Sequence, residues 1–572
     1  MILPAYPVLD FSGGVRRDLG ALEVQRNQLL DARNAHLYSR GRVIGRRGSH
    51  KIGSTLSTRI EDIFAFVRYN TSGVANSWVF VNTNGTTAVL STLTSTKLTS
   101  GITTASTTAS VTSTTNTPVD FAVSGVVEIE GDLISYTGNS GTSFTGLTGI
   151  RVSHDAGASV NQWTTMAQSG TAVDGRMGIT YAVLNNILFI VGRGANFKQF
   201  DGSSVSDVSG EPAGLFVTNY RDRLYAAGDG SSGTNGSSRR VSFSARGDGT
   251  SWTTASDFFD MEDQLGQPIT GFLVHSDRLG IFKTQSTFVY NEVELKETIK
   301  GVGAYNHKVA VPVNGSIYTF CPNGIFETNL SSATQIGGPV RDFWENFMPT
   351  YDSVSKRVCM NTYAWSHRDS YFLYIGDITS PTSTDDVVLE FDTIRRNWTV
   401  HDGGFTDFVN ATELKHFRYG DNTLTSSPTV FASDISGQIF RMNDTRYVDT
   451  DGTKRGSDIL TDEIADSAGN PIPIVLETKL HDLEQPGLWK VFDRIRVFSE
   501  NSQWSVQYRV ENEDGITDYK PLGTVSRSNQ TLLFPKDAAG WRIGFKVTCI
   551  NGAGVPVFNG FVLENTDMKE RV

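Results

Sequence analysis

Cysteine is scarce in this chain. The 572 residues include three cysteines, Cys321, Cys359 and Cys549, which are odd in number and widely spaced. This excludes a disulfide framework and gives no metal-ligand pattern. Each cysteine lies among apolar neighbours, so we expect inert buried thiols in a protein made in a reducing compartment.

Long hydrophobic runs are missing as well. The most apolar stretch, YAVLNNILFIVG at 181–192, is short and interrupted by two asparagines, as expected of a hairpin. The first residues, MILPAYPVLDFSGG, lack the basic start, apolar core and cleavage site of a secretory signal. We therefore expect neither a secretory leader nor stable membrane insertion.

Charged residues are few and helical patterns are rare. Asp, Glu, Lys and Arg make up 19% of the chain, whereas Gly alone accounts for 56 residues among many Thr, Ser, Val, Phe and Tyr. This composition favours turns and strands and predicts an all-β protein. The length predicts two to four domains. The best helical candidates are two short segments, residues 20–36 and 340–347.

The basic residues are unevenly distributed. From Gly13 to Lys51, nine Lys or Arg accompany three Asp or Glu, so this segment is near +6 and the rest of the chain, within a total of −11, is near −17. A nucleic-acid-binding arm and a connector that meets acidic partner chains are the two interpretations. Apolar residues from Leu19 to Leu37 favour an element that packs. Elsewhere no basic stripe is interleaved with aromatics, so we expect no high-affinity DNA binding.

A repeated unit covers the middle of the chain, from about residue 166 to 450. In each unit a short apolar strand, a turn and a second strand ending in Tyr or Phe recur, with starts near 186, 222, 277, 315, 370 and 429. Such spacing is typical of β-propeller blades, because one twisted sheet cannot bury both faces alone whereas a ring of sheets can. We predict a six-bladed β-propeller. A β-helix is the alternative, but its repeat is shorter and more regular.

Two further β modules are predicted. Residues 92–165 begin Ser/Thr-rich and continue with alternating strands, which indicates an inserted small β module. Its expected core is Val127, Ile129, Leu133, Ile134, Tyr136, Phe144, Leu147 and Val160. Clean alternation after residue 471 predicts a C-terminal β-sandwich-like domain, with strands that close the propeller sheet as the alternative. The expected organisation is an N-terminal assembly segment with the first propeller or platform strands (1–91), the insert (92–165), the propeller (166–470) and the C-terminal domain (471–572).

No segment predicts catalysis. SARGDGTSW at 244–252 approaches the Asp box of sialidase propellers, but Asp248 and Gly249 are adjacent and the spacing fails; its Arg-Gly-Asp is expected to be a turn. The loop 448–458 carries Asp449, Asp451 and Asp458 but lacks the closing Glu of a calcium loop, which favours a solvated loop. No zinc pair, phosphate loop or nucleophile elbow is present. We therefore predict no enzyme activity and no catalytic, cofactor or metal site.

Three passages resemble one group of proteins. The first carries Phe11, Gly13, Gly14, Asn27, Gln28, Asn34, Gly41, Arg46, Arg47 and Gly48. The second, 239–290, carries Ser244, Gly247, Asp248, Trp252 and Ile-Thr-Gly at 269–271. These two resemble the nozzle or tail-hub proteins of short-tailed bacteriophages, called tail tubular protein B. The insert, with EIEGDLISYTGNSGTSFTGLTGIRVSHDAGASV, is similar to a small β module recurrent in phage structural proteins.

The resemblance implies a structural virion protein of the short tail, assembled in the host bacterial cytoplasm. It implies a homo-hexameric ring around the DNA channel, built from a propeller with β platform and tip domains. The ring would join the portal-adaptor ring, tail fibres or spikes, and a tail tip or needle protein. Phage DNA would pass without sequence-specific binding, and a loop facing the axis would act as the gate.

Two other function classes compete with this one. One is a virion-associated or secreted propeller that binds or cleaves glycans, and the other is a generic scaffold for protein partners. For the nozzle we select, as contacts to neighbouring subunits or the adaptor, Arg16, Arg17, Arg42, Arg46 and Arg47. Solvated loop charge is the alternative for these arginines, because isolated surface pairs contribute little. Changing Arg46 and Arg47 to Glu is expected to impair assembly without unfolding the monomer.

Overall fold

The computed structural model describes most of the chain. The described residues are 2–37, 41–46, 49–52, 56, 59–69, 75–83, 90–114, 120–130, 132–166, 179–192, 197–228, 238–261, 266–347, 349, 362–376, 387–402, 408–414, 428–434, 437–442 and 473–569. Among them strands predominate, and α1 (Arg341–Trp344) with η1 (Gly338–Val340) are the only helical elements. Within these ranges no helix is long and apolar enough to cross a membrane.

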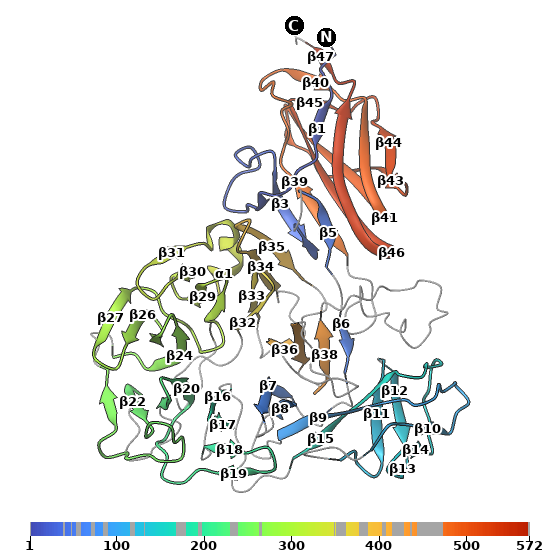
Figure 1. Cartoon of the computed structure of the whole chain (residues 1–572). Helices are drawn as coiled ribbons and strands as arrows, with labels where there is room; N and C mark the ends of the chain where they lie inside the picture. Colours follow the sequence, from blue (N-terminus) through green and yellow to red (C-terminus); the bar gives the residue numbers. More distant parts are fainter. Residues whose placement is uncertain are drawn as a thin grey trace.

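Seven groups of four antiparallel strands are arranged in a ring (Figure 1). Blade 1 contains β7 (Ile60–Tyr69), β8 (Ala75–Thr83), β9 (Leu90–Lys97) and β15 (Ser159–Thr165). Blade 2 contains β16 (Thr180–Leu184), β17 (Ile187–Val191), β18 (Lys198–Phe200) and β19 (Val205–Asp207). Blade 3 contains β20 (Phe216–Tyr220), β21 (Arg223–Ala227), β22 (Arg240–Phe243) and β23 (Phe258–Asp260). Blade 4 contains β24 (Ile269–His275), β25 (Arg278–Lys283), β26 (Ser286–Tyr290) and β27 (Leu295–Lys300).

Three more blades complete the ring. Blade 5 contains β28 (Val311–Val313), β29 (Ser316–Cys321), β30 (Gly324–Thr328) and β31 (Ala333–Gln335). Blade 6 contains β32 (Thr362–His367), β33 (Ser370–Ile375), β34 (Val387–Asp392) and β35 (Asn397–His401). Blade 7 contains β36 (Phe408–Leu414), β37 (Thr429–Asp434), β38 (Ile439–Met442) and, from the N-terminal part of the chain, β6 (Ser49–Lys51). The molecule is therefore an all-β protein with a β-propeller.

Apolar side chains fill the space between neighbouring blades. Phe64 of blade 1 stacks on Tyr181 of blade 2 with ring centroids 4.7 Å apart, and Tyr318 of blade 5 stacks on Tyr371 of blade 6 at 5.5 Å. Ile60 of blade 1 belongs to the same buried cluster as Phe431 of blade 7. Each sheet thus buries both faces against its neighbours, which is the physical reason the ring is stable.

The prediction of six blades is one too few. The missed blade is blade 1, whose third and fourth strands lie 61 residues apart because the insert separates them. The predicted insert, 92–165, takes in most of β9 because that segment is rich in Ser and Thr, and all of β15 because its residues continue the alternating pattern. The structure pairs them with each other, from Ser91↔Thr165 to Lys97↔Ser159, and β9 with β8.

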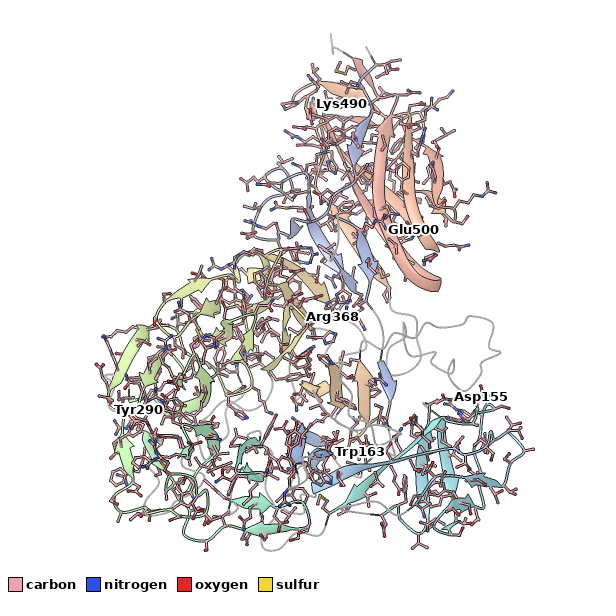
Figure 2. The ribbon with its side chains drawn as sticks, viewed as in Figure 1. Asp155, Trp163, Tyr290, Arg368, Lys490 and Glu500 are labelled. Carbon is pink, nitrogen blue, oxygen red and sulfur yellow. The ribbon has the colours of Figure 1, made fainter. Side chains whose placement is uncertain are left out.

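The inserted module lies between β9 and β15 and projects from blade 1 (Figure 1). Its strand β11 (Gly125–Ile129) pairs with both β15 and β12 (Asp132–Tyr136). A second sheet contains β10 (Thr108–Ser110), β13 (Gly138–Asn139) and β14 (Ser143–Thr145). All expected core residues are members of one buried cluster except Leu133, which is half-buried outside it. Trp163, at the base of the module, donates from its indole N–H to the carbonyl of Ile52, 2.8 Å away (Figure 2).

The C-terminal domain is built on two long strands, β41 (Arg494–Asn512) and β46 (Arg542–Glu564), which pair along most of their length. The same sheet includes β39 (Ile474–Thr478), β42 (Gly515–Ile516), β43 (Lys520–Val525) and β44 (Asn529–Leu533). A three-stranded sheet of β40 (Trp489–Val491), β45 (Ala539–Gly540) and β47 (Asp567–Lys569) lies at the end remote from the propeller (Figure 1). Alternate side chains such as Trp504, Val506 and Tyr508 point into a common core, giving the sandwich-like domain.

The N-terminal segment is part of this C-terminal domain. It contributes β1 (Tyr6–Val8), β2 (Gly14–Val15), β3 (Gln28–Arg33), β4 (Ala35–His36) and β5 (Val43–Gly45), of which β1 and β5 pair with β46 and β3 with β39. The helix predicted at 20–36 is therefore wrong. Leu29 and Ala32 belong to a strand, and Asn34, with φ of 57°, breaks any helix there. The helical prediction for 340–347 is confirmed by α1.

Candidate functional site

Four of the five arginines selected from the sequence are described, and they lie near the junction between propeller and C-terminal domain, with different exposures. Arg16 pairs with Asp18, and Arg17 pairs with Asp342 next to the propeller at 2.6 Å. The side chains of Arg16 and Arg17 remain 30% and 29% exposed. Arg42 is exposed, whereas Arg46 is buried. Arg47 lies outside the described residues.

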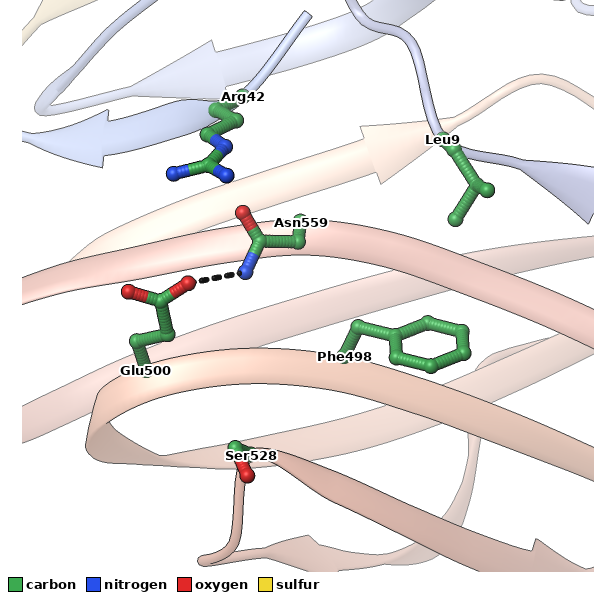
Figure 3. A pocket seen from close by; sticks show the side chains of 6 residues that line it. All are labelled: Leu9, Arg42, Phe498, Glu500, Ser528 and Asn559. Atoms are coloured by element: carbon green, nitrogen blue, oxygen red, sulfur yellow. Dashed lines mark hydrogen bonds between the residues drawn. The ribbon is translucent and has the colours of Figure 1, made fainter.

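Arg42 borders a shallow pocket of about 300 Å³ on the C-terminal domain (Figure 3). Leu9 and Phe498 supply its apolar wall, and the side-chain amide of Asn559 donates to Glu500 at 2.9 Å on the polar side. The guanidinium stands over this polar side in Figure 3. An exposed cation beside an apolar surface is suited to contact with another protein chain.

Arg46 is used inside the chain. Its Nε donates to Oδ1 of Asn34 at 3.0 Å, and Asn34, which is fully buried, donates from Nδ2 to Asp402 at 2.7 Å and to the carbonyl of Pro473 at 2.9 Å. Asn34 therefore joins the N-terminal segment to blade 6 and to the start of β39. Arg46→Glu would remove the hydrogen-bond donor to Asn34 and leave buried polar groups unsatisfied, so it would destabilise the fold. The prediction that this change impairs assembly without unfolding the monomer therefore does not hold for Arg46.

A charged cleft of about 620 Å³ adjoins this network. Arg33 pairs with Asp31 at 2.7 Å and also with Asp402, and Arg17 lies 3.5 Å from Asp31. Burial raises the pKa of Asp31, although Arg33 and Arg17 oppose the rise. Lys546 of β46 lines the same cleft. The ion pairs connect β3 to the end of blade 6, so they fix the relative position of the two parts.

Two histidines and a glutamate form a buried cluster at the same junction. His36 Nδ1 lies 2.6 Å from Oε2 of Glu390, and His401 Nε2 lies 2.9 Å from the same oxygen. Ser370 donates its hydroxyl to the other carboxylate oxygen at 2.9 Å, and the Thr399 hydroxyl donates to Oε2 at 3.1 Å. The carboxylate thus accepts from two different segments of the chain.

The environment controls the charge of this cluster. Burial disfavours the charged form of Glu390, but the two histidines outweigh it and hold the pKa of the carboxyl well below its usual range. Burial lowers the pKa of His401 to about 4, with Glu390 opposing the shift. At neutral pH Glu390 is therefore ionised and His401 neutral. Among the described residues, His36, Glu390 and His401 are the group of side chains that could hold a metal ion.

The axis of the propeller holds a second buried polar cluster. Lys308, just before blade 5, donates to both carboxylate oxygens of Asp62 in blade 1 at 2.7 and 2.6 Å, and Asn410 of blade 7 donates to Asp62 at 2.9 Å. His307 lies 3.2 Å from the carbonyl of Ile179 at the start of blade 2. Blades 1 and 5 are not neighbours in the ring, so these contacts cross the axis. Segment 306–308 therefore occupies the place where a propeller would otherwise have an open axial channel.

The other sequence-based candidates fall into three groups. The Arg-Gly-Asp at 246–248 is a turn, as predicted, with Gly247 at φ of 73° and Asp248 accepting from the backbone of Thr250 at 2.9 Å. Cys321 and Cys549 are buried, as predicted. Cys359 and the acidic loop 448–458 lie outside the described residues.

Neither buried cluster is evident from the sequence. His36 and Glu390 are 354 residues apart, and Asp62 and Lys308 are 246 apart, so no local spacing connects them. For the cluster on the propeller axis, one glycine in the sequence marks a close contact. Gly271 lies in the Ile-Thr-Gly of the second resembling passage, and a Cβ there would meet the backbone of His307 at 2.7 Å.

Comparisons with known proteins give distant structural similarity. No protein-family model and no curated protein matches the chain. Among solved structures, it is similar to YCF48 bound to D1 peptide, with 9% identity, a TM-score of 0.33, and 70% of this chain and 96% of that chain covered. It is similar to BamB from Moraxella catarrhalis, with 8% identity, a TM-score of 0.32, and 71% and 99% covered. It is also similar to an exo-β-1,3-galactanase from Phanerochaete chrysosporium, with 7% identity, a TM-score of 0.25, and 70% and 98% covered. At these scores the similarity carries no inference about activity.

Proposed function

We propose that this β-propeller protein is the tail nozzle of a short-tailed bacteriophage. In this role six copies form a ring that retains and then releases the genome, and the ring links the portal-adaptor ring to fibres or spikes. The observation that supports the proposal is the position of the residues that carry the resemblance. Phe11, Gly14, Asn34 and Arg46 all lie where the N-terminal segment joins the other two parts.

These residues have specific roles at the junction. Gly14, at φ of 68°, lies so close to blade 6 that a Cβ would meet the Cβ of Asn397 at 2.6 Å. Phe11 packs on Phe558 of β46, with ring centroids 5.9 Å apart. Asn34 connects three chain segments, as described above. The described residues of the first resembling passage therefore lie together at the junction, which supports a family relationship more strongly than scattered matches would.

The structure also bears on where DNA would run in such a nozzle. Lys308 and Asp62 occupy the propeller axis, so the proposed conduit is the central hole of a ring of copies and not the propeller itself. The net charge of −11 favours passage without sticking, because an acidic wall repels phosphates.

Glycan binding or cleavage is the competing function. Its support is the similarity to glycan-cleaving enzymes such as the galactanase, and a TM-score of 0.25 carries no argument about function. A hydrolase of this kind needs two carboxylates flanking an open site. At the axis, the described carboxylate is Asp62, which is fully buried and paired with Lys308. We therefore propose a structural role and not an enzymatic one.

Negative-stain electron microscopy and light scattering of the purified chain test the proposal. We expect hexameric rings, and we expect Arg42→Glu to reduce the fraction of rings severalfold because Arg42 is an exposed cation at the junction. Arg246→Glu is the matched control, since Arg246 is an exposed arginine on blade 3. A stable monomer that binds or hydrolyses oligosaccharides would refute the nozzle and favour the competing function.

A further inference from the structure

The cluster of His36, Glu390 and His401 has the composition of a metal site. Two imidazoles and one carboxylate are a common ligand set for zinc, and all three residues are at most 6% exposed. Their ligand atoms lie within 4.8 Å of one another. They come from β4 in the N-terminal segment and from β34 and β35 in blade 6.

We propose that these three residues bind one zinc ion, which fastens the N-terminal segment to the propeller. Ligand atoms around a tetrahedral zinc ion, at about 2.0–2.1 Å from it, are roughly 3.3 Å apart. The present distances to Glu390 Oε2, 2.6 and 2.9 Å, are those of hydrogen bonds. The side chains must separate by less than about 1 Å to admit the ion. The neutral rings then carry their protons on the nitrogens that face away from the metal.

The surroundings of the cluster suit this site. The hydroxyl of Ser370 donates to Oε1 of Glu390, the carboxylate oxygen that the two histidines do not contact. Hydrogen bonds of this kind orient the ligands of metal sites. The Thr399 hydroxyl, 3.1 Å from the ligating oxygen, is near enough to supply a fourth donor.

Metal analysis of the full-length protein tests the site. The chain is stripped with a chelator, dialysed against Zn²⁺, freed of unbound metal and measured by mass spectrometry. We expect about one zinc per chain, and we expect His401→Gln and Glu390→Gln to lower the zinc content at least tenfold. His367→Gln is the matched control, because His367 lies 3.3 Å from Glu413 in a buried pair that the metal cluster does not include. It should retain the zinc.

Cobalt substitution of the wild-type chain gives a second measurement that does not depend on whether the variants fold. Co²⁺ in a low-coordinate nitrogen and oxygen site shows strong visible absorption, unlike the hydrated ion. We expect this spectrum, and we expect Zn²⁺ to displace it. Zinc content in the wild type no higher than in folded Glu390→Gln, or a Co²⁺ spectrum of the hydrated ion alone, would show that the cluster is held by hydrogen bonds only and overturn the proposal.

Discussion

At the scale of single residues, the ion pair on the propeller axis has the clearest energetic consequence. Asp62 is fully buried and Lys308 is nearly so, with 16% of its side chain exposed. Lys308→Met leaves a buried carboxylate without its cation, which costs about 3–5 kcal/mol. We expect the propeller to unfold at a clearly lower urea concentration, as followed by tryptophan fluorescence.

The matched control for this change is an exposed ion pair of the same chain. Arg341 and Glu345 are 61% and 48% exposed, so Arg341→Met should cost less than about 1 kcal/mol. A second control is the double variant Asp62→Asn with Lys308→Met, which removes both charges and should recover part of the loss. Equal sensitivity of the two single variants would contradict a special role for the axis.

The inserted module should respond to pH through His154. Its ring lies 3.3 Å from Glu130 and 3.4 Å from Asp132, and although burial alone would lower the pKa of His154, these carboxylates raise it above 6.5. Because the pKa of His154 is higher in the folded state, protonated His154 stabilises the module. This stabilisation is complete below pH 6.5, the pKa in the unfolded chain, and is lost as the pH rises through the pKa in the folded chain. We expect faster hydrogen exchange in residues 125–136 at pH 8 than at pH 6, after correction for intrinsic rates. His154→Gln should remove the difference.

The same cluster limits the module at acid pH. Burial would raise the pKa of Asp132, but hydrogen bonds from His154 and Arg151 lower it below 3.8. Because the pKa of Asp132 is lower in the folded state, ionised Asp132 stabilises the module at any pH above the pKa in the unfolded chain. This stabilisation is lost as the pH falls through the pKa in the folded chain. The module should therefore be most stable between about pH 4 and pH 6.5.

At the scale of elements, β6 is the strand on which closure of the ring depends. It forms the outer strand of blade 7, with His50 opposite Arg441 and the backbone N–H of Ile52 donating to Ile439 at 2.8 Å. In an antiparallel ladder every second residue donates its N–H to the partner strand, so His50, two residues before Ile52, is a donor as well. Proline has no N–H, so His50→Pro should remove this hydrogen bond and detach β6. Limited proteolysis should then cut near residues 49–52 and 439–442. His50→Thr, which keeps the N–H, should resist cleavage as the wild type does.

The insert should be removable without loss of the propeller. Since Lys97 and Ser159 face each other at the ends of paired strands, an Asn-Gly turn can replace residues 98–158 and close a hairpin. We expect the propeller to melt within a few degrees of the intact chain. A protein that no longer folds would show that the module contributes to ring closure.

How much of this fold could be predicted depended on whether the signal was local. Hairpins such as the one around Asn185 and Asn186 were visible, because alternation and turn residues lie within a few positions. Blade 1 was missed because 61 residues separate β9 from β15. In the candidate site, the importance of Arg16, Arg17 and Arg42 was inferred from charge, but the burial of Arg46 depends on Asn34 and on Asp402, a partner 356 residues away. Such contacts exist only in the folded chain.

At the scale of the whole molecule, Asn34 is one of the residues that hold the propeller and the C-terminal domain together. Asn34→Gly keeps the positive φ of 57° and removes the side-chain bonds to Asp402, Pro473 and Arg46. We expect small-angle X-ray scattering to show a larger radius of gyration, with circular dichroism unchanged. Asn186→Gly is the control, because Asn186 has φ of 61° at an exposed hairpin turn. An unchanged radius in both variants would contradict the role of Asn34.

The N-terminal strands β1 and β6 pair with strands that the ribosome makes much later. The strand β6 leaves the ribosome about 390 residues before β38, which it must join, and β1 waits still longer for β46. At about 5–20 residues per second, β6 remains without β38 for roughly 20–80 seconds. This basic segment is thus exposed throughout translation of the acidic remainder. The nascent chain can complete its ring only after β38 (Ile439–Met442) has been made, so products truncated before this strand cannot form closed propellers that enter an assembly.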